Sequence, residues 1–194
     1  MSKVLFVNGC NNATSYTHQI ASVFVDEYSK CHKDDDIITR NLYEEDIKFL
    51  TIEDINERTK ENFDLEPERE IFKYVKEFLE ADKIIIAAPF WNLSIPAIMH
   101  AYLEHIAVPN ITHIPAKQGT VGLCQSKKVV HIVTRGIYSS KIEYGDSYLR
   151  AFFATLGIKD FRTIALEGTD IHAGQEEKFF EISANNAKSL AQIW

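Results

Sequence analysis

The sequence predicts a single α/β domain in three layers, with a doubly wound, five-stranded parallel sheet between two layers of helices. Short apolar runs alternate with amphipathic stretches along the whole chain, which is the pattern of strands joined by crossover helices. Two of these runs, Val4–Val7 and Ile84–Ala88, are apolar throughout, as expected for parallel strands that are covered on both faces. No repeat, low-complexity linker or change of composition marks a boundary within residues 1–194, so one domain is expected.

Five short apolar runs are expected to form the strands. In chain order they are Val4–Val7, Ile37–Leu42, Ile84–Ala88, Val129–Val133 and Phe161–Leu166. Helices are expected where apolar residues recur at spacings of three and four, because such residues share one helical face. These faces consist of Ile20, Val23, Phe24 and Tyr28; of Ile71, Tyr74, Val75, Phe78 and Leu79; of Ile98, Met99, Tyr102, Leu103 and Ile106; and of Phe179, Phe180, Ser183, Ala187, Leu190 and Ala191.

Two stretches interrupt this alternation of strands and helices. Thr51–Glu70 is rich in acidic residues and asparagine, and we interpret it as a polar, partly helical excursion before the third strand. Pro109–Cys124 contains two prolines, two glycines and the short β-type run Ile111–Ile114. This composition favours a small hairpin or a lid-like loop.

Charge and cysteine usage limit the partners and the compartment. The chain carries 28 acidic and 21 basic side chains, a formal net charge of −7, which argues against nucleic-acid and membrane partners. Cys10, Cys31 and Cys124 are odd in number and form no C-x-x-C pair, so a reducing compartment is expected rather than a disulfide framework. The apolar runs are too short for a signal peptide or a membrane span. We therefore expect a cytoplasmic protein.

The ligand of an open α/β sheet lies beyond the carboxyl ends of its strands, where three loops are informative. The first loop, Asn8–Thr17, matches neither a P-loop nor a dinucleotide fingerprint, because it has no Gly-Lys-Ser/Thr and only one glycine. It offers the hydroxyls of Thr14, Ser15, Tyr16 and Thr17 where a helix begins. Helix-start amides attract anions, so this loop suits a monophosphate. Taken alone, it is more often a simple N-cap run.

The other two loops offer an aromatic wall and a cation. Pro89–Pro96 places two large aromatic residues and Asn92 after a buried strand, which suits a flat ring, although aromatic packing under a helix is an equal alternative. Thr134–Ser140 places Arg135 and Gly136 after the next strand, where they could stabilise negative charge on such a ring. A surface arginine beside a turn glycine is the simpler alternative for this loop alone. Together, the three loops predict a site for flavin mononucleotide (FMN).

Over essentially its whole length the chain resembles the FMN-dependent NADH azoreductases, which are flavodoxin-fold quinone and azo-dye reductases of bacteria. The resemblance is carried by the first loop, Asn8–Thr17, which we call the hydroxyl loop, and by the segments Ala87–Pro96, Thr134–Ser139, Tyr148–Phe153 and Leu156–Ile158. The loop Pro89–Pro96 with its asparagine, which we call the aromatic loop, is the most specific of these motifs, and the hydroxyl loop is the least specific. A flavodoxin-like fold is therefore expected.

The resemblance also implies the residues that contact FMN. Those implied at its phosphate are Cys10, Ser15, Tyr16 and Thr17; those at its ring are Pro89, Phe90, Trp91, Asn92 and Leu93; those at its pyrimidine edge are Thr134, Arg135 and Gly136, with Tyr138 as a further contact. Two features depart from the family pattern. Cys10 stands where serine is frequent, and one glycine follows Arg135 where two are usual.

The implied activity is two-electron transfer from NADH through FMN to a quinone or an azo compound, with ping-pong kinetics, in a homodimer that forms the site at its interface. No catalytic side chain is expected, because the cofactor carries the chemistry. NADPH remains an alternative donor, although the loops offer no clamp for its 2′-phosphate. The alternative functions are a quinone reductase without azo activity, a flavodoxin-type electron carrier and a flavin-free binding protein.

Three other signals are interpreted as structural. His100 and His105 do not have the H-E-x-x-H spacing, so no metal site is expected. His18 and His131 are interpreted as a helix-surface residue and a strand residue, respectively. Cys124 is interpreted as a small buried hydrophobic residue rather than a nucleophile.

Overall fold

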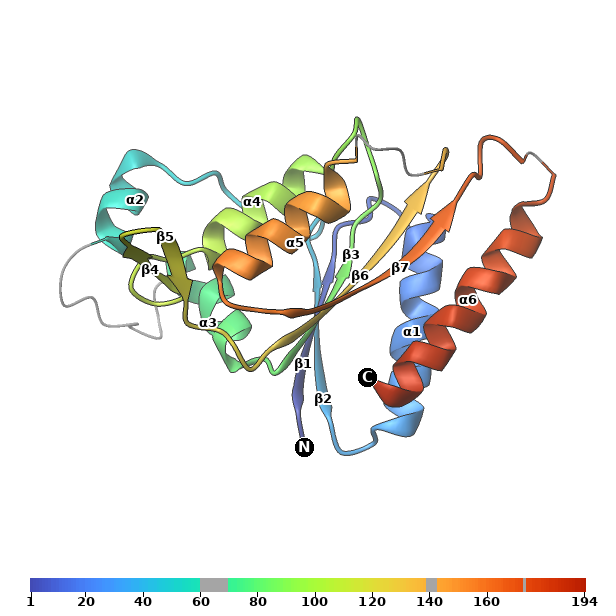
Figure 1. Cartoon of the computed structure of the whole chain (residues 1–194), viewed down its shortest axis with the longest axis horizontal. Coiled ribbons are helices and arrows are strands. Elements are labelled where there is room, and N and C mark those ends of the chain that lie inside the picture. Colours follow the sequence, from blue (N-terminus) through green and yellow to red (C-terminus); the bar gives the residue numbers. More distant parts are fainter. Residues whose placement is uncertain (60–69, 139–142, 173) are drawn as a thin grey trace.

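A computed structural model describes residues 1–59, 70–138, 143–172 and 174–194. It contains the predicted five-stranded parallel sheet, in the order β2-β1-β3-β6-β7 (Figure 1). The strands are β1 (Lys3–Asn8), β2 (Asp36–Asn41), β3 (Lys83–Ala87), β6 (Lys128–Arg135) and β7 (Asp160–Glu167). All five strand predictions are confirmed to within two residues at each end. The doubly wound flavodoxin-like arrangement follows from this order, because the chain winds to one side from β1 to β2 and to the other side from β3 onward.

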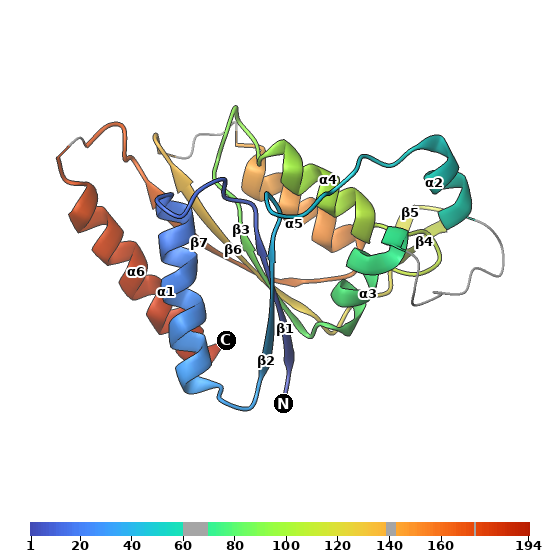
Figure 2. The ribbon, with the colours of Figure 1, turned by 180° about the vertical axis from the view of Figure 1, so that it is seen from behind.

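Helices cover both faces of the sheet. On one face lie α1 (Tyr16–Cys31) and α6 (Glu176–Ile193), and on the other lie α3 (Lys73–Glu80), α4 (Ala97–Ile106) and α5 (Gly145–Thr155), as Figures 1 and 2 show from opposite sides. Each face has its own apolar core between sheet and helices. Helix α5 was not among the helices predicted from apolar faces. Its residues Leu149, Phe152 and Phe153 lie at helical spacing and pack on the core of this face, so the sequence contains an apolar stripe for α5 that the prediction missed.

The two interrupting stretches contain local structure of their own. Within Thr51–Glu70, helix α2 (Ile52–Arg58) begins with a capping box in which the Thr51 and Asp54 side chains bond each other's backbone amides. Residues 60–69 of that stretch lie outside the described residues, and a short 3-10 helix, Glu70–Phe72, precedes α3.

The stretch Pro109–Cys124 forms the predicted hairpin, made of the antiparallel strands β4 (His113–Ala116) and β5 (Gly119–Gly122). The hairpin is packed against the end of α5 rather than over the carboxyl edge of the sheet (Figure 1). A Cβ atom on Gly122 would lie only 2.0 Å from the Gly157 backbone nitrogen, so Gly122 allows this close approach.

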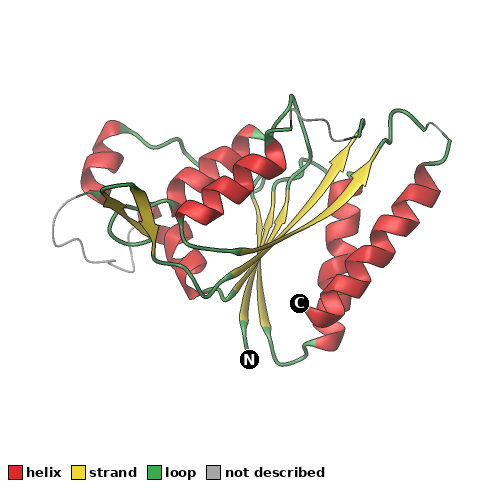
Figure 3. Cartoon of the chain, viewed as in Figure 1, coloured by secondary structure: helices red, strands yellow, loops and turns green. Residues whose placement is uncertain are grey.

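The loops that follow β1, β3, β6 and β7 leave the sheet at one edge (Figure 3). Two backbone hydrogen bonds join a loop to the end of the neighbouring strand there: Gly9 N donates to Ala87 O at 2.8 Å, and Phe90 N donates to Thr134 O at 3.2 Å. The fold therefore brings the three loops singled out in the sequence to one edge, which includes the reversal of strand order between β1 and β3. Among the described helices, none has both the length and the apolar character that crossing a membrane requires.

Candidate functional site

The hydroxyl loop ends at the first turn of α1, where Ser15 occupies the N-cap position. The Ser15 side chain makes no capping hydrogen bond, so the simple N-cap explanation does not account for it. Two residues later, the Thr17 hydroxyl is buried and has no hydrogen-bond partner among the described residues. A buried hydroxyl without a partner costs about 1–3 kcal/mol, and the start of a helix attracts anions. A phosphate bound at this turn would satisfy the Thr17 hydroxyl.

The remaining predicted residues of this loop differ in exposure. Cys10 is buried, with its Sγ 3.9 Å from the Ala87 carbonyl oxygen, and burial raises the pKa of its thiol to about 11 although the Ser15 hydroxyl lowers it. Cys10 is therefore a neutral thiol beside Ser15, and a weaker hydrogen-bond donor than serine would be. Tyr16 is 36% exposed and its ring centroid lies 6.0 Å from that of Phe180 on α6.

The aromatic loop contains a tight reverse turn. Trp91 N donates to Ser94 O at 2.8 Å and Ser94 N donates to Trp91 O at 2.9 Å. Between them, Asn92 and Leu93 have φ angles of +49° and +69°, the pattern of a type I′ turn. A leucine in this left-handed region costs roughly 1–2 kcal/mol, so the turn is strained at the residue that the sequence places beside the ring.

The turn presents its side chains outward. Trp91 is 39% exposed and Leu93 is 50% exposed, so the alternative of aromatic packing under a helix is wrong for Trp91. Phe90 is half-buried, and the Arg135 guanidinium lies 5.8 Å from the centre of its ring. Tyr144 N, at the start of α5, donates to the Leu93 carbonyl at 3.0 Å and anchors the turn. The loop therefore offers an exposed indole on a rigid support.

Arg135 is a buried ion-pair partner rather than a surface residue. Only 4% of it is exposed, and its guanidinium donates to Glu167 Oε1 at 3.0 Å and to Glu143 Oε1 at 3.3 Å. Glu143 also accepts from Asp146 N at 2.9 Å and so caps α5. Two carboxylates compensate the charge of Arg135, so it is not a free cation at this edge. The structure gives it a structural role, tying the loop after β6 to the end of β7 and the start of α5.

The rest of the third loop is shaped by the loop after β7. Asp170 N donates to Gly136 O at 2.8 Å, and a Cβ atom on Gly136 would overlap the Asp170 carboxylate. The Tyr138 hydroxyl lies 2.8 Å from Nε2 of His172, and this pair is exposed. The Thr134 hydroxyl is buried without a partner among the described residues. Residues 139 and 140, the serines that end the predicted loop, lie outside the described residues.

All thirteen predicted cofactor residues lie at this edge, in the three loops, the first turn of α1 or the last two residues of β6. Among the described residues, three buried polar atoms of these loops lack a partner: the hydroxyls of Thr17 and Thr134 and Nε of Arg135. A ligand with hydrogen-bonding groups would satisfy such atoms, so the residues present fit the FMN that the sequence predicts.

Sequence reasoning missed the carboxylates that organise the site, Glu143, Asp146 and Glu167. Glu143 and Glu167 lie 8 and 32 residues from Arg135 in the chain, so no local motif joins them to it. Only the pairing of β6 with β7, which sets Arg135 opposite Glu167, could have pointed to one of them.

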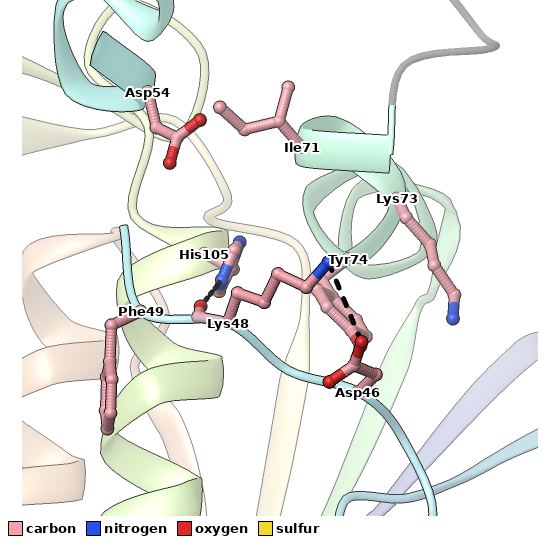
Figure 4. A pocket seen from close by; sticks show the side chains of 8 residues that line it. All are labelled: Asp46, Lys48, Phe49, Asp54, Ile71, Lys73, Tyr74 and His105. Atoms are coloured by element: carbon pink, nitrogen blue, oxygen red, sulfur yellow. Dashed lines mark hydrogen bonds and ion pairs between the residues drawn. The ribbon is translucent and has the colours of Figure 1, made fainter. Parts of the chain in front are cut away.

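A separate cavity of about 130 Å³ lies between α2, α3 and α4 (Figure 4). His105 borders it, with Nε2 2.8 Å from the Lys48 carbonyl oxygen and with Nδ1 unpaired among the described residues. The other residues that line it are Asp46, Lys48, Phe49, Asp54, Ile71, Lys73 and Tyr74. None of the predicted cofactor residues borders this cavity. Within the described part of the chain, no cluster of three or more His, Cys, Asp or Glu residues could hold a metal ion.

The comparisons with known proteins agree with this geometry. The family model described as a flavodoxin-like fold matches residues 2–191. The chain is 42% identical to an FMN-dependent NADH:quinone oxidoreductase of Clostridium perfringens and 43% identical to FMN-dependent NADH:quinone oxidoreductase 2 of Clostridium acetobutylicum, with 99% of each chain covered in both cases. The crystal structure of an azoreductase from Bacillus anthracis superposes with a TM-score of 0.91 at 27% identity and covers both chains completely. The chain therefore belongs to the flavodoxin-like fold family, as the motifs in its sequence predicted.

Proposed function

We propose that this protein is an FMN-dependent NADH:quinone oxidoreductase that also reduces azo compounds. The observation that carries the proposal is the exposed Trp91–Ser94 turn at the same edge as the buried, unpaired hydroxyls of Thr17 and Thr134. Relatives that are 42% and 43% identical along almost the whole chain carry the name FMN-dependent NADH:quinone oxidoreductase, and the similar Bacillus anthracis structure is an azoreductase.

Each loop has a distinct task in this function. The first turn of α1, with Ser15, Tyr16 and Thr17, holds the phosphate through hydroxyls and helix-start amides. The turn from Trp91 to Leu93 borders the ring and orients it. Bound FMN supplies the transfer of electrons from NADH to the acceptor. No side chain of the described loops is needed as an acid or a base, so the protein contributes binding, orientation and exclusion of water.

A homodimer is part of this proposal. An apolar surface around α2 supports it, because Phe49, Ile52 and Ile55 are 78%, 62% and 45% exposed. A groove of about 350 Å³ continues this surface, and its lining consists of Leu50, Ile55, Arg58, Thr59, Glu104, Ala107 and Pro109. A second copy of the chain would cover these side chains. Sedimentation at several concentrations measures the expected dimer.

A cytoplasmic location is also proposed. Cys10, Cys31 and Cys124 are all free thiols, which is consistent with a reducing compartment.

Anaerobic reduction of the reconstituted protein tests the activity. The purified protein is incubated with FMN, desalted and mixed with NADH or NADPH, and a quinone and an azo dye are then supplied side by side. Retained flavin that NADH bleaches and both acceptors reoxidise is the expected result. Turnover of the quinone alone would leave a quinone reductase without azo activity. Retained flavin that ignores both nicotinamides would indicate an electron carrier, and no retained flavin would refute the proposal.

A further inference from the structure

His131 occupies an unusual position for an ionisable side chain. It lies in the middle of β6, opposite Ile86 of β3 and Thr163 of β7, and none of it is exposed to solvent. This placement confirms the interpretation of His131 as a strand residue. Its ring is nevertheless not merely packed: Nδ1 lies 2.9 Å from Asp146 Oδ1, and Nε2 lies 3.3 Å from the carbonyl oxygen of Ala88.

Both neighbours of the ring are acceptors. Burial raises the pKa of the Asp146 carboxyl, but hydrogen bonds from His131, Thr163 and Arg150 outweigh burial and hold that pKa well below its usual range. The distances are 2.6 Å from the Thr163 hydroxyl to Oδ1 and 2.7 Å from Arg150 Nε to Oδ2. The ion pair with Arg150 makes Asp146 a carboxylate whatever the state of His131, and neither a carboxylate nor a backbone carbonyl can donate. Both nitrogens of His131 find a partner only if both carry a proton.

The two acceptors belong to the two segments that hold the aromatic loop in place, the end of β3 and the start of α5. Ala88 is the first residue after β3, two positions before Phe90, and its amide donates to Ile132 O at 3.1 Å. Asp146 lies in the first turn of α5, directly after the segment in which Tyr144 N holds the Leu93 carbonyl. His131 therefore bridges the beginning of the loop and the helix that anchors its turn.

We propose that His131 is a buried imidazolium and a positioning residue of the cofactor site, which fixes the loop Ala88–Ser94 between β3 and the start of α5. This role rests on the proposed function, because the loop matters only if it borders FMN. Other charged groups near the bridge are already paired. Arg150 and Asp146, both on α5, form an ion pair with each other. Arg135, which lies at the end of β6 on the carboxyl side of His131, forms ion pairs with Glu143 and Glu167.

Two substitutions separate the contacts of the ring. In H131N the amide nitrogen replaces Nδ1 and can still donate to Asp146, whereas in H131Q it replaces Nε2 and can still donate to Ala88. Both variants remove the same charge and the same aromatic ring, so each is the matched control of the other. If the bridge positions the loop, the dissociation constant of FMN rises about tenfold in each variant, because each keeps only one end of the bridge. Urea unfolding of the FMN-free proteins shows how far each variant is destabilised.

The protonation of the ring is measured in the unsubstituted chain. Long-range proton–nitrogen NMR spectra of histidine-labelled protein distinguish a ring nitrogen with a proton from one with a lone pair. We expect two protonated nitrogens for His131 at pH 7, both without FMN and with it. A lone pair on either nitrogen would overturn the imidazolium, even if neither variant folds. An FMN affinity that neither folded variant lowers would overturn the positioning role. Failure of the unsubstituted protein to bind FMN would refute the proposed function and leave the NMR result standing.

Discussion

Replacing Thr17 with valine should change the stability of the FMN-free protein and its affinity for FMN in opposite directions. The hydroxyl is buried without a partner among the described residues, and valine has the same branched shape without the polar group. Removing an unpaired buried hydroxyl stabilises a protein by about 1 kcal/mol, at the lower end of the 1–3 kcal/mol that such a group costs. For a chain of this length that corresponds to a rise of about 2–4 °C in the melting temperature.

The same substitution removes one hydrogen bond to the phosphate. A hydrogen bond to a charged group contributes about 1.5–3 kcal/mol, so the dissociation constant of FMN should rise roughly 10- to 100-fold. Thermal unfolding of the FMN-free protein measures the first effect, and quenching of FMN fluorescence on binding measures the second.

Thr14→Val is the matched control for Thr17→Val. It makes the same change in the same loop, but the Thr14 hydroxyl is exposed and lies 2.8 Å from Asn12 Oδ1. It should leave both the melting temperature and the FMN affinity nearly unchanged. If Thr17→Val lowers the melting temperature and spares FMN binding, the Thr17 hydroxyl has a partner within the protein, and the assignment of the phosphate to this turn is wrong.

Three further predictions concern a buried thiol, a buried ion pair and a tightly packed glycine. Iodoacetamide at pH 8 should label exposed Cys31 and spare Cys10, whose thiol pKa of about 11 keeps the thiolate scarce until the pH approaches that value; mass spectrometry identifies the labelled peptide. Arg135→Met should lower the free energy of urea unfolding by about 3 kcal/mol, because it leaves two carboxylates without their buried partner. Gly122→Ala should cost about 2–3 kcal/mol in the same assay, because its Cβ atom would overlap the Gly157 backbone.

Each of these predictions has a direct counter-result. Equal labelling of Cys10 and Cys31 in the folded protein would show that Cys10 is accessible. For Arg135→Met, the control is Arg162→Met at an exposed ion pair, where a loss below about 0.5 kcal/mol is expected; equal losses would contradict a buried pair at Arg135. For Gly122→Ala, the control is Gly119→Ala in the same hairpin, where nothing lies within 4 Å but φ is +104°. A larger loss at Gly119 would mean that backbone conformation outweighs packing in this hairpin.

The sheet and the location of the site could be predicted because they depend on patterns that are local in the chain. Val4–Val7 and Ile84–Ala88 are buried along their whole length in the structure, which is why their unbroken apolar character was informative. The carboxyl ends of parallel strands necessarily share one edge, so the loops after these strands had to meet. Helix α5 is the exception: its apolar face, to which Leu149, Phe152 and Phe153 belong, is local in the chain as well, and the prediction missed it.

The detailed geometry of the site could not be predicted, because it depends on partners that are distant in the chain. The sequence shows the hydroxyl of Thr17 but not that it is unpaired. It shows Arg135 but not the two carboxylates that compensate it. The type I′ turn is also hidden, since Leu93 is an improbable residue for a left-handed conformation and only the surrounding hydrogen bonds hold it there.

The charges around the aromatic loop suggest why a buried imidazolium belongs to this site. Arg135 with Glu143 and Glu167 carries one net negative charge, because two carboxylates compensate one guanidinium. His131 with Asp146 and Arg150 carries one net positive charge if the ring is protonated, and none if it is neutral. The two clusters share the start of α5, and with Asp170, whose carboxylate lies against Gly136, this edge carries one net negative charge in the first case and two in the second. A protonated His131 therefore halves the net negative charge beside the loop, and negative charge opposes the arrival of electrons at a ring that the loop would border.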